Sequence, residues 1–133
     1  MEEILDALTE EIIAAGIEVH RRLGPGLLES TYEHCLCREL SLRGISYRRQ
    51  APIPLEYRGT SLDCGYRIDV LVSDRVVVEL KSIDQILPVH VAQVLTYLKL
   101  SRHPVGLLMN FNVVALKYGL RRVTLRNSDL LIS

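Results

Sequence analysis

The sequence contains no tryptophan and one phenylalanine, and its charges cancel, because 16 lysines and arginines balance 16 aspartates and glutamates. A net charge of zero argues against a histone-like coating protein, although it does not exclude a local basic groove. The scarcity of aromatic residues leaves no stacking platform of the kind that single-strand binders use. No apolar run approaches the ~18 residues needed to cross a bilayer, so we expect no membrane span.

Cysteine and histidine are too few and too scattered for a metal framework. Cys35 and Cys37 lie two residues apart in a stretch with helical periodicity, where their side chains point away from each other. The third cysteine is Cys64, and the four histidines form no HxxxH or HExxH cluster. We therefore expect neither a structural zinc site nor disulfide bonds. Reduced cysteines and an acidic N-terminus, unlike a secretory signal, predict a cytoplasmic protein.

What the chain has is enough apolar sequence for one core. It contains 133 residues, of which 48% are hydrophobic. This length is typical of one domain and allows enough burial for stability without cross-links. We predict a single domain over residues 1–133, since we find no repeat, linker or low-complexity segment.

Hydrophobic periodicity predicts a mixed α/β fold. Apolar residues recur every three or four positions in the segments predicted to be helices, which are residues 4–23, 27–43 and 89–100. Alternating apolar residues predict the strands, which are residues 45–57, 64–72, 75–81, 105–110, 113–117 and 121–125. Prolines in the first of these strands are typical of an edge. The order ααβββαββ(β) indicates a central mixed sheet of antiparallel hairpins flanked by helices.

Charged residues interrupt two neighbouring strand patterns that are otherwise strongly apolar. Even-numbered positions in both strands are apolar, whereas the odd positions include Asp69, Glu79 and Lys81. If Val72 pairs with Val76 across a short loop, Asp69 lies opposite Glu79. A shift of one residue would move Asp69 among the valines of the apolar face. The pattern therefore predicts two carboxylates and a lysine together on the other face of the sheet.

Two carboxylates at close range repel each other unless a cation compensates them. Oxygen ligands in this arrangement suit a hard divalent ion, and a nearby lysine can orient or deprotonate a water molecule bound to it. The simpler alternative is an exposed sheet face with an ordinary cross-strand pair between Glu79 and Lys81. The spacing alone leaves both interpretations open.

These residues also belong to a longer ordered set. Asp69, followed after ten residues by Glu79-Leu80-Lys81, resembles the signature of the PD-(D/E)xK nuclease superfamily, with Ile68 in place of the proline. Residues 26–32, Gly-Leu-Leu-Glu-Ser-Thr-Tyr, form the GxxExxY string that names a small prokaryotic family placed in that superfamily. Gln93 to Tyr97 resembles its QxxxY element, and Asn110-Phe111 resembles the end of the family's late strand.

The resemblance implies a restriction-endonuclease-like fold and a metal-dependent site. Asp69 and Glu79 would ligate Mg²⁺ (or Mn²⁺), and the backbone carbonyl of Leu80 would supply another oxygen. Lys81 would position the attacking water and stabilise charge on the phosphate. Glu29 would add a further carboxylate ligand near the start of the second helix. The alternative for Glu29 is compensation of the helix dipole.

Two residues of the third predicted helix complete the set. Gln93 and Tyr97 are four residues apart and therefore share a helix face. They would hydrogen-bond the lysine, waters on the metal or the substrate backbone; the alternative is a surface glutamine and a half-buried tyrosine. The candidate catalytic residues are thus Glu29, Asp69, Glu79, Lys81, Gln93 and Tyr97.

We therefore predict a metal-dependent nuclease that hydrolyses phosphodiester bonds in DNA or RNA. Short basic pairs at 21–22, 48–49 and 121–122, the last with Arg126, are candidates for contacts with a phosphate backbone; the alternative for each is a solvated face. A homodimer would supply the two sites needed to cut both strands of a duplex. One alternative is a non-catalytic module on the same fold that binds nucleic acid or protein. Another is hydrolysis of a different phosphorylated substrate.

Overall fold

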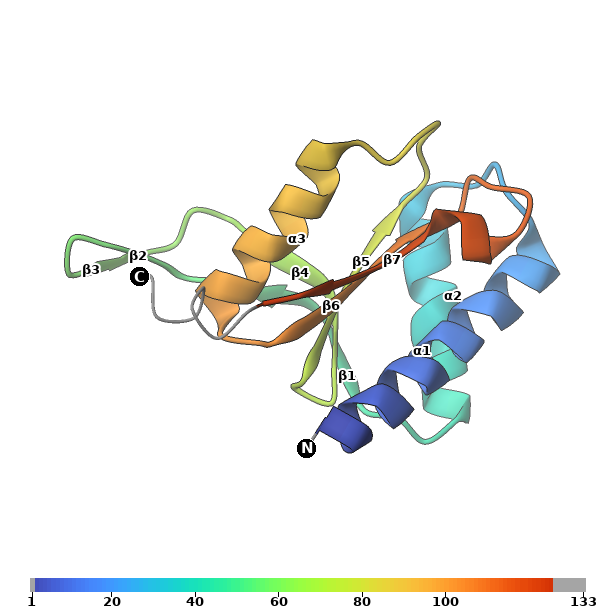
Figure 1. Cartoon of the computed structure of the whole chain (residues 1–133), viewed down its shortest axis with the longest axis horizontal. Helices are drawn as coiled ribbons and strands as arrows, with labels where there is room; N and C mark the ends of the chain where they lie inside the picture. Colours follow the sequence, from blue (N-terminus) through green and yellow to red (C-terminus); the bar gives the residue numbers. More distant parts are fainter. Residues whose placement is uncertain (1, 126–133) are drawn as a thin grey trace.

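The centre of the protein is a five-stranded mixed sheet in the order β1-β4-β5-β6-β7 (Figure 1), in a computed structural model that describes residues 2–125. Its strands are β1 (Tyr47–Pro52), β4 (Arg67–Val72), β5 (Val76–Lys81), β6 (Val105–Asn110) and β7 (Leu120–Thr124). The helices are α1 (Glu2–Leu23), α2 (Glu29–Leu42) and α3 (Pro88–Ser101). Only β5 and β6 run parallel, and α3 connects them. The predicted mixed α/β fold is confirmed.

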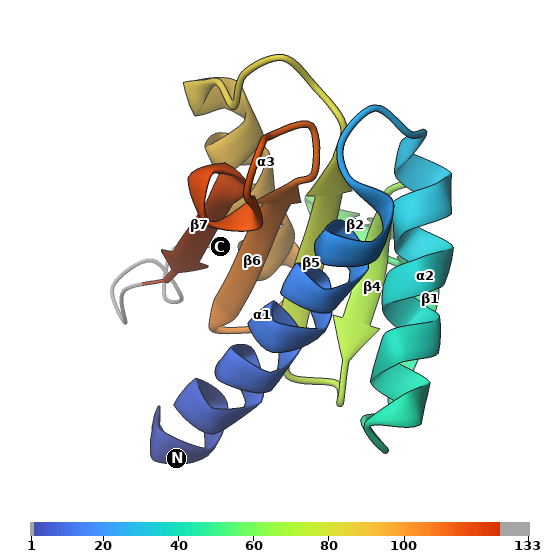
Figure 2. The same cartoon turned by 90° about the vertical axis from the view of Figure 1, so that its right-hand side faces the viewer.

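Helices cover both faces of the sheet, with α1 and α2 on one side and α3 on the other (Figure 2). The cluster beneath α1 and α2 contains Val70 and Val78, whereas the cluster beneath α3 contains Leu71 and Val77. Since the α3 side is covered, the alternative of an exposed charged face is wrong. None of the described helices is long and apolar enough to cross a membrane.

The hairpin of β4 and β5 has the predicted register. Val72 pairs with Val76, and the two strands run antiparallel. The chain reverses at Ser73 and Asp74, which have positive φ angles of 52° and 53°. This register places Asp69 opposite Glu79 at the other end of the hairpin.

The alternation between the two faces reverses at one point of β1 and β4. Val70 packs beneath α1 and α2, but Ile68 packs beneath α3, although both positions are even-numbered. The register of β1 and β4 skips Gln50 and Asp69, and Gln50 has a positive φ of 52°. The predicted continuous apolar face is therefore wrong at Ile68, because this irregularity turns the backbone over.

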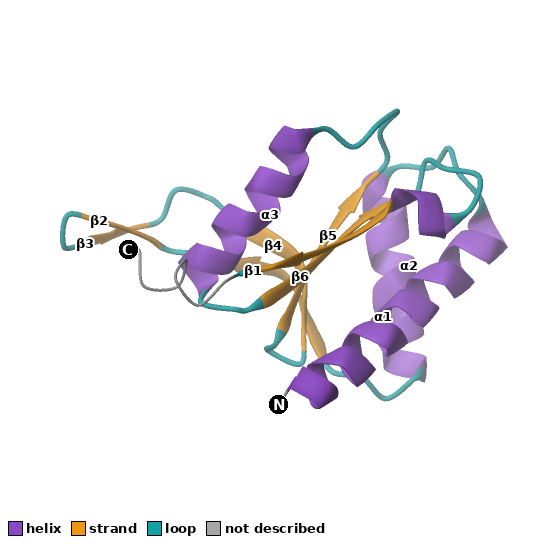
Figure 3. Ribbon diagram, viewed as in Figure 1, coloured by secondary structure: helices purple, strands orange, loops and turns teal. Residues whose placement is uncertain are grey.

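The connection from β1 to β4 forms a separate hairpin. Its strands are β2 (Leu55–Tyr57) and β3 (Thr60–Leu62), which extend away from the main sheet (Figure 3). Arg58 and Gly59 form the turn, both with positive φ, as a two-residue hairpin loop requires. The single strand predicted over 45–57 is therefore two strands, of which β1 lies at the edge of the main sheet as its prolines indicated.

The predicted strand at 113–117 is wrong. The chain there forms a loop followed by a short 3₁₀ helix, Leu116–Gly119, before β7 begins. Val114 is 87% exposed whereas Leu116 is buried, so the apolar alternation does not follow a sheet face. The last predicted strand is confirmed as β7.

Gly106 of β6 marks a close approach of α3 to the sheet. A Cβ atom at this position would lie 2.7 Å from Val94 Cγ1 and 3.3 Å from the backbone oxygen of Val77. We expect Gly106→Ala to lower the free energy of unfolding by about 1–3 kcal/mol, because a well-packed core does not accept the extra methyl group. Urea denaturation measures this loss.

Gly16→Ala is the matched control. Its Cβ would meet only the ends of the Leu116 and Met109 side chains, at 3.0 Å. Alanine also favours the helix by about 1 kcal/mol over glycine, which offsets a small adjustment of these flexible side chains. A loss for Gly106→Ala no larger than that for Gly16→Ala would contradict the close packing of α3.

Candidate active site

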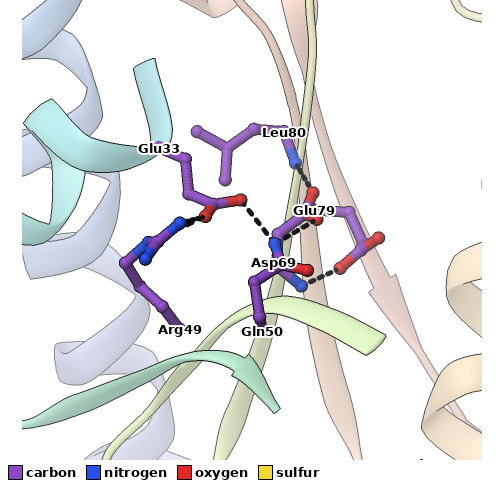
Figure 4. A network of polar contacts seen from close by, with 6 residues as sticks. All are labelled: Glu33, Arg49, Gln50, Asp69, Glu79 and Leu80. Carbon is purple, nitrogen blue, oxygen red and sulfur yellow. Dashed lines mark hydrogen bonds and ion pairs between the residues drawn. The ribbon is translucent and has the colours of Figure 1, made fainter. Parts of the chain in front are cut away.

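Asp69 and Glu79 face each other where β4 and β5 stop pairing (Figure 4). The backbone N–H of Asp69 donates to Glu79 Oε2 at 2.8 Å, and the N–H of Leu80 donates to Asp69 Oδ2 at 3.0 Å. Each carboxylate thus binds the main chain of the opposite strand, in place of a bond between the two backbones. The main chain therefore fixes the positions of both carboxylates.

Burial makes this carboxylate pair hard to ionise. Burial, and then the neighbouring Asp69 carboxylate, raise the pKa of Glu79 from 4.5 to about 8. Burial also raises the pKa of Asp69, against the effect of the Leu80 N–H, which favours the charged form. Perturbed acids of this kind concentrate at functional sites, where a bound cation can restore their charge.

Lys81 is the third member of the predicted group. It ends β5 and is half-buried, and its charge lowers the pKa of both Asp69 and Glu79. Glu79 itself is only 3% exposed, and no ion pair within 4.0 Å joins it to Lys81 among the described residues. The alternative of an ordinary surface Glu–Lys pair is therefore wrong.

Helix α3 brings Gln93 and Tyr97 to the same side of the sheet. Gln93 Nε2 donates to the hydroxyl oxygen of Tyr97 at 3.2 Å, which confirms that the two share a helix face. Burial, and then the charge of Glu79, raise the pKa of Tyr97. Gln93 also borders an open hollow of about 410 Å³ with Val89 and His90.

Glu29 lies at the edge of this group. It begins α2 and is exposed, and the N–H of Ser82, the residue after Lys81, donates to its Oε2 at 3.4 Å. Within residues 2–125 no three His, Cys, Asp or Glu side chains are grouped to hold a metal ion. The structure thus does not join Glu29 to Asp69 and Glu79 as a third ligand, and its role as a ligand stays a prediction.

The tyrosine of the GxxExxY string holds the loop before α2. Tyr32 is fully buried, its hydroxyl donates to the Gly24 carbonyl at 2.6 Å, and it accepts from the Leu27 N–H at 3.1 Å. Its ring stacks on Phe111 with 4.5 Å between centroids. The Leu27 carbonyl in turn accepts the Ser82 hydroxyl at 2.7 Å, so this loop supports the chain just after Lys81.

Asn110 at the end of β6 supports the same segment from the other side. Its amide accepts from the Ile83 N–H at 3.1 Å and donates to the Ile83 carbonyl at 3.0 Å. The next residue, Phe111, donates its N–H to the Lys81 carbonyl at 2.9 Å. The Asn-Phe pair that the sequence singled out therefore anchors the backbone around Lys81.

Sequence reasoning missed two residues that lie behind Asp69. Glu33 of α2 is 6% exposed, and Gln50 Nε2 donates both to Glu33 Oε1 at 2.9 Å and to Asp69 Oδ1 at 3.4 Å. One signal existed for Glu33, because its spacing from Leu36 and Leu40 places a charge on the buried face of the helix. No signal existed for Gln50, whose left-handed backbone the sequence does not predict.

Five of the six arginines in the predicted basic pairs have carboxylate partners. Arg49 binds Glu33, with 2.6 Å between Nη2 and Oε2. The other contacts within residues 2–125 are Arg21 and Arg22 with Glu18, Arg48 with Asp74, and Arg122 with Asp6. These five arginines therefore do not form a free basic track, whereas Arg121 Nη1 donates to the Leu120 carbonyl and Arg126 lies outside the described residues.

A family model of the PD-(D/E)XK nuclease superfamily matches residues 6–123. The match covers most of the chain, from within α1 to β7, and includes the carboxylate pair, so the chain belongs to this superfamily. Its five-stranded mixed sheet between helices is consistent with the restriction-endonuclease-like fold. No curated protein and no solved structure matches the chain significantly.

The chemistry of the site fits a hard divalent ion. Asp69 and Glu79 supply two carboxylates, and the Leu80 carbonyl lies between Glu79 and Lys81 in the chain. Mg²⁺ is commonly held by one or two carboxylates and completes its coordination with waters and substrate phosphates. Both acids have raised pKa values in the absence of a cation, and a bound cation would lower these pKa values by favouring the charged forms.

The raised pKa of Glu79 should make the stability of the metal-free protein depend on pH. Between about pH 4.5 and 8 the folded protein holds a proton that the unfolded chain has released, so stability falls as the pH rises. We expect the free energy of unfolding to drop over this pH range by a few kcal/mol more in the wild type than in Glu79→Gln, since one pKa unit corresponds to about 1.4 kcal/mol. Urea denaturation in the presence of EDTA measures the difference. Equal pH dependence in the two proteins would contradict the raised pKa.

Proposed function

We propose that the protein hydrolyses phosphodiester bonds in nucleic acid with Mg²⁺ or Mn²⁺ as cofactor. The observation that carries the proposal is the opposed pair of carboxylates, half-buried Asp69 and buried Glu79, with Lys81 at the end of β5. Membership of a nuclease superfamily supports nucleic acid as the substrate. When bound, the divalent ion would polarise the phosphate and lower the pKa of a water molecule.

Each residue of the site then has a chemical task. Asp69 and Glu79 hold the ion, with the Leu80 carbonyl as a further oxygen. Lys81 orients the attacking water and stabilises negative charge on the phosphate. This electrostatic stabilisation is strongest in a site shielded from solvent. Gln93 and Tyr97 form a hydrogen-bonded pair beside the carboxylates, from which they contact the substrate backbone.

The exposed position of Glu29 suits a supplementary role. Its carboxylate lies next to Ser82 rather than between β4 and β5. We expect it to contribute an oxygen ligand, either directly or through water, once the ion and the substrate are in place. Water-mediated carboxylates are common around Mg²⁺, which gives up its waters reluctantly.

The GxxExxY string supports a finer placement within the superfamily. Glu29 and Tyr32 both contact the loops that flank Lys81, directly or through Leu27 and Ser82. We propose membership of the GxxExxY family, a single domain over residues 1–133 and a cytoplasmic location. A homodimer would supply the second site needed to cut both strands of duplex DNA.

One observation favours the second candidate, a non-catalytic module that binds nucleic acid or protein. The described residues contain no group of three His, Cys, Asp or Glu side chains for a metal ion. A weak metal site would leave the fold as a binding surface. Cleavage and metal binding therefore have to be measured on the same variants.

We expect the purified protein to cleave nucleic acid in Mg²⁺ or Mn²⁺ and to be inactive in EDTA. Lys81→Ala should lower turnover by orders of magnitude and leave the Kd for the ion nearly unchanged, because both carboxylates remain. Asp69→Asn should abolish cleavage and also weaken metal binding, because it removes a charged ligand. Gel-based cleavage assays and isothermal titration calorimetry measure the two effects.

The matched controls are Lys117→Ala and Asp63→Asn, which change exposed residues of the same types outside the site. Both should cleave like the wild type. If Lys81→Ala and Asp69→Asn retain full metal binding and do not differ from their controls in cleavage, the cleavage comes from a contaminant and the binding module is the better account.

A further inference from the structure

A continuous chain of polar contacts connects α2 with the carboxylate pair (Figure 4). Arg49 donates to Glu33 Oε2 from Nε at 2.8 Å, and Gln50 Nε2 donates to Glu33 Oε1 at 2.9 Å. The same amide nitrogen lies 3.4 Å from Asp69 Oδ1 and donates to it. Asp69 Oδ2 accepts the N–H of Leu80, so the amide and the main chain hold one oxygen each.

Glu33 is itself fully engaged. Its side chain is 8% exposed, and both oxygens accept hydrogen bonds, one from Arg49 and the other from Gln50. Unlike Asp69, Glu33 forms an ion pair with the Arg49 guanidinium at 2.6 Å, which already compensates its charge. Its contacts fit an anchor for Gln50 rather than a ligand.

The backbone of Gln50 points to the same role. Its φ of 52° lies in the left-handed region, which costs a residue other than glycine roughly 1 kcal/mol or more. The register of β1 and β4 skips Gln50 and Asp69, so neither residue is fixed by that ladder. In this left-handed conformation the Gln50 amide lies within hydrogen-bonding distance of both the Glu33 and the Asp69 carboxylates.

We propose that Glu33 and Gln50 are positioning residues that fix the orientation of the Asp69 carboxylate for a divalent ion. Arg49 holds Glu33, Glu33 holds the Gln50 amide, and the amide holds Asp69 Oδ1. The inference rests on the proposed metal-dependent function and assigns to it two residues outside the Asp-Glu-Lys group. Outer contacts of this kind typically change metal affinity by about 10–100-fold.

Gln50→Gly tests the proposal cleanly. Glycine accepts a positive φ, so the variant removes the amide without straining the backbone, and Gln50 is exposed, so no core contact is lost. We expect the Kd for Mn²⁺, measured by calorimetry, to rise at least about tenfold. Gln50→Asn, whose shorter amide cannot span both carboxylates, should behave alike. Raising the Mn²⁺ concentration should restore turnover in both variants.

Ser73→Gly is the matched control, because Ser73 has the same φ of 52° in the loop at the opposite end of the hairpin. It should bind Mn²⁺ like the wild type. Glu33→Gln should also raise the Kd for Mn²⁺. Because Glu33 acts through Gln50, the Kd of the double variant Glu33→Gln/Gln50→Gly should not exceed the higher of the two single-variant Kd values. Additive effects would overturn this relay.

The outcomes separate the two proposals. If Asp69→Asn loses Mn²⁺ binding but Gln50→Gly binds like Ser73→Gly, the positioning role is wrong and the metal site stands. If the wild type binds no Mn²⁺ at all, the proposed function fails, and the positioning role fails with it.

Discussion

The site depends on the way in which β4 and β5 stop pairing. Beyond Val70 and Val78, the Asp69 and Glu79 carboxylates bind the N–H groups of the opposite strand. Buried N–H groups must find acceptors, and here side-chain carboxyl oxygens replace carbonyls. Two acids are thereby held side by side in the sheet interior, at a distance where both resist ionisation.

The helices on both faces bury the carboxylate pair and thereby change its pKa values. On an open sheet, solvent would screen the two acids and their pKa values would stay near the usual range. Beneath α3, burial raises the pKa of Glu79 to about 8 and also raises that of Tyr97. Lys81 opposes the shift of Glu79 but does not cancel it. The fold therefore holds two acids whose charged forms a divalent cation would favour, and this links the packing of the sheet to the proposed chemistry.

The register could be predicted because hydrophobicity enforces it. In this register Val70, Val72, Val76 and Val78 share one face and Asp69 lies opposite Glu79, although Ile68 leaves that face. Gln50 could not be predicted, because its left-handed backbone is set by tertiary contacts rather than by local propensity. The false strand at 113–117 has a similar origin. Gly119 packs against the Asn110 carbonyl, and a Cβ at Gly119 would lie 2.1 Å from that oxygen. This tertiary contact fixes the loop, and the apolar alternation of residues 113–117 does not reveal it.

Anomalous diffraction from crystals grown with Mn²⁺ tests the central claim most directly. The account predicts an anomalous peak within bonding distance of both the Asp69 and Glu79 carboxylates, with Gln50 still hydrogen-bonded to Asp69. The peak should be absent from crystals of Asp69→Asn grown in the same solution. A wild-type structure in which these two carboxylates keep their backbone contacts and no peak lies beside them would contradict the account.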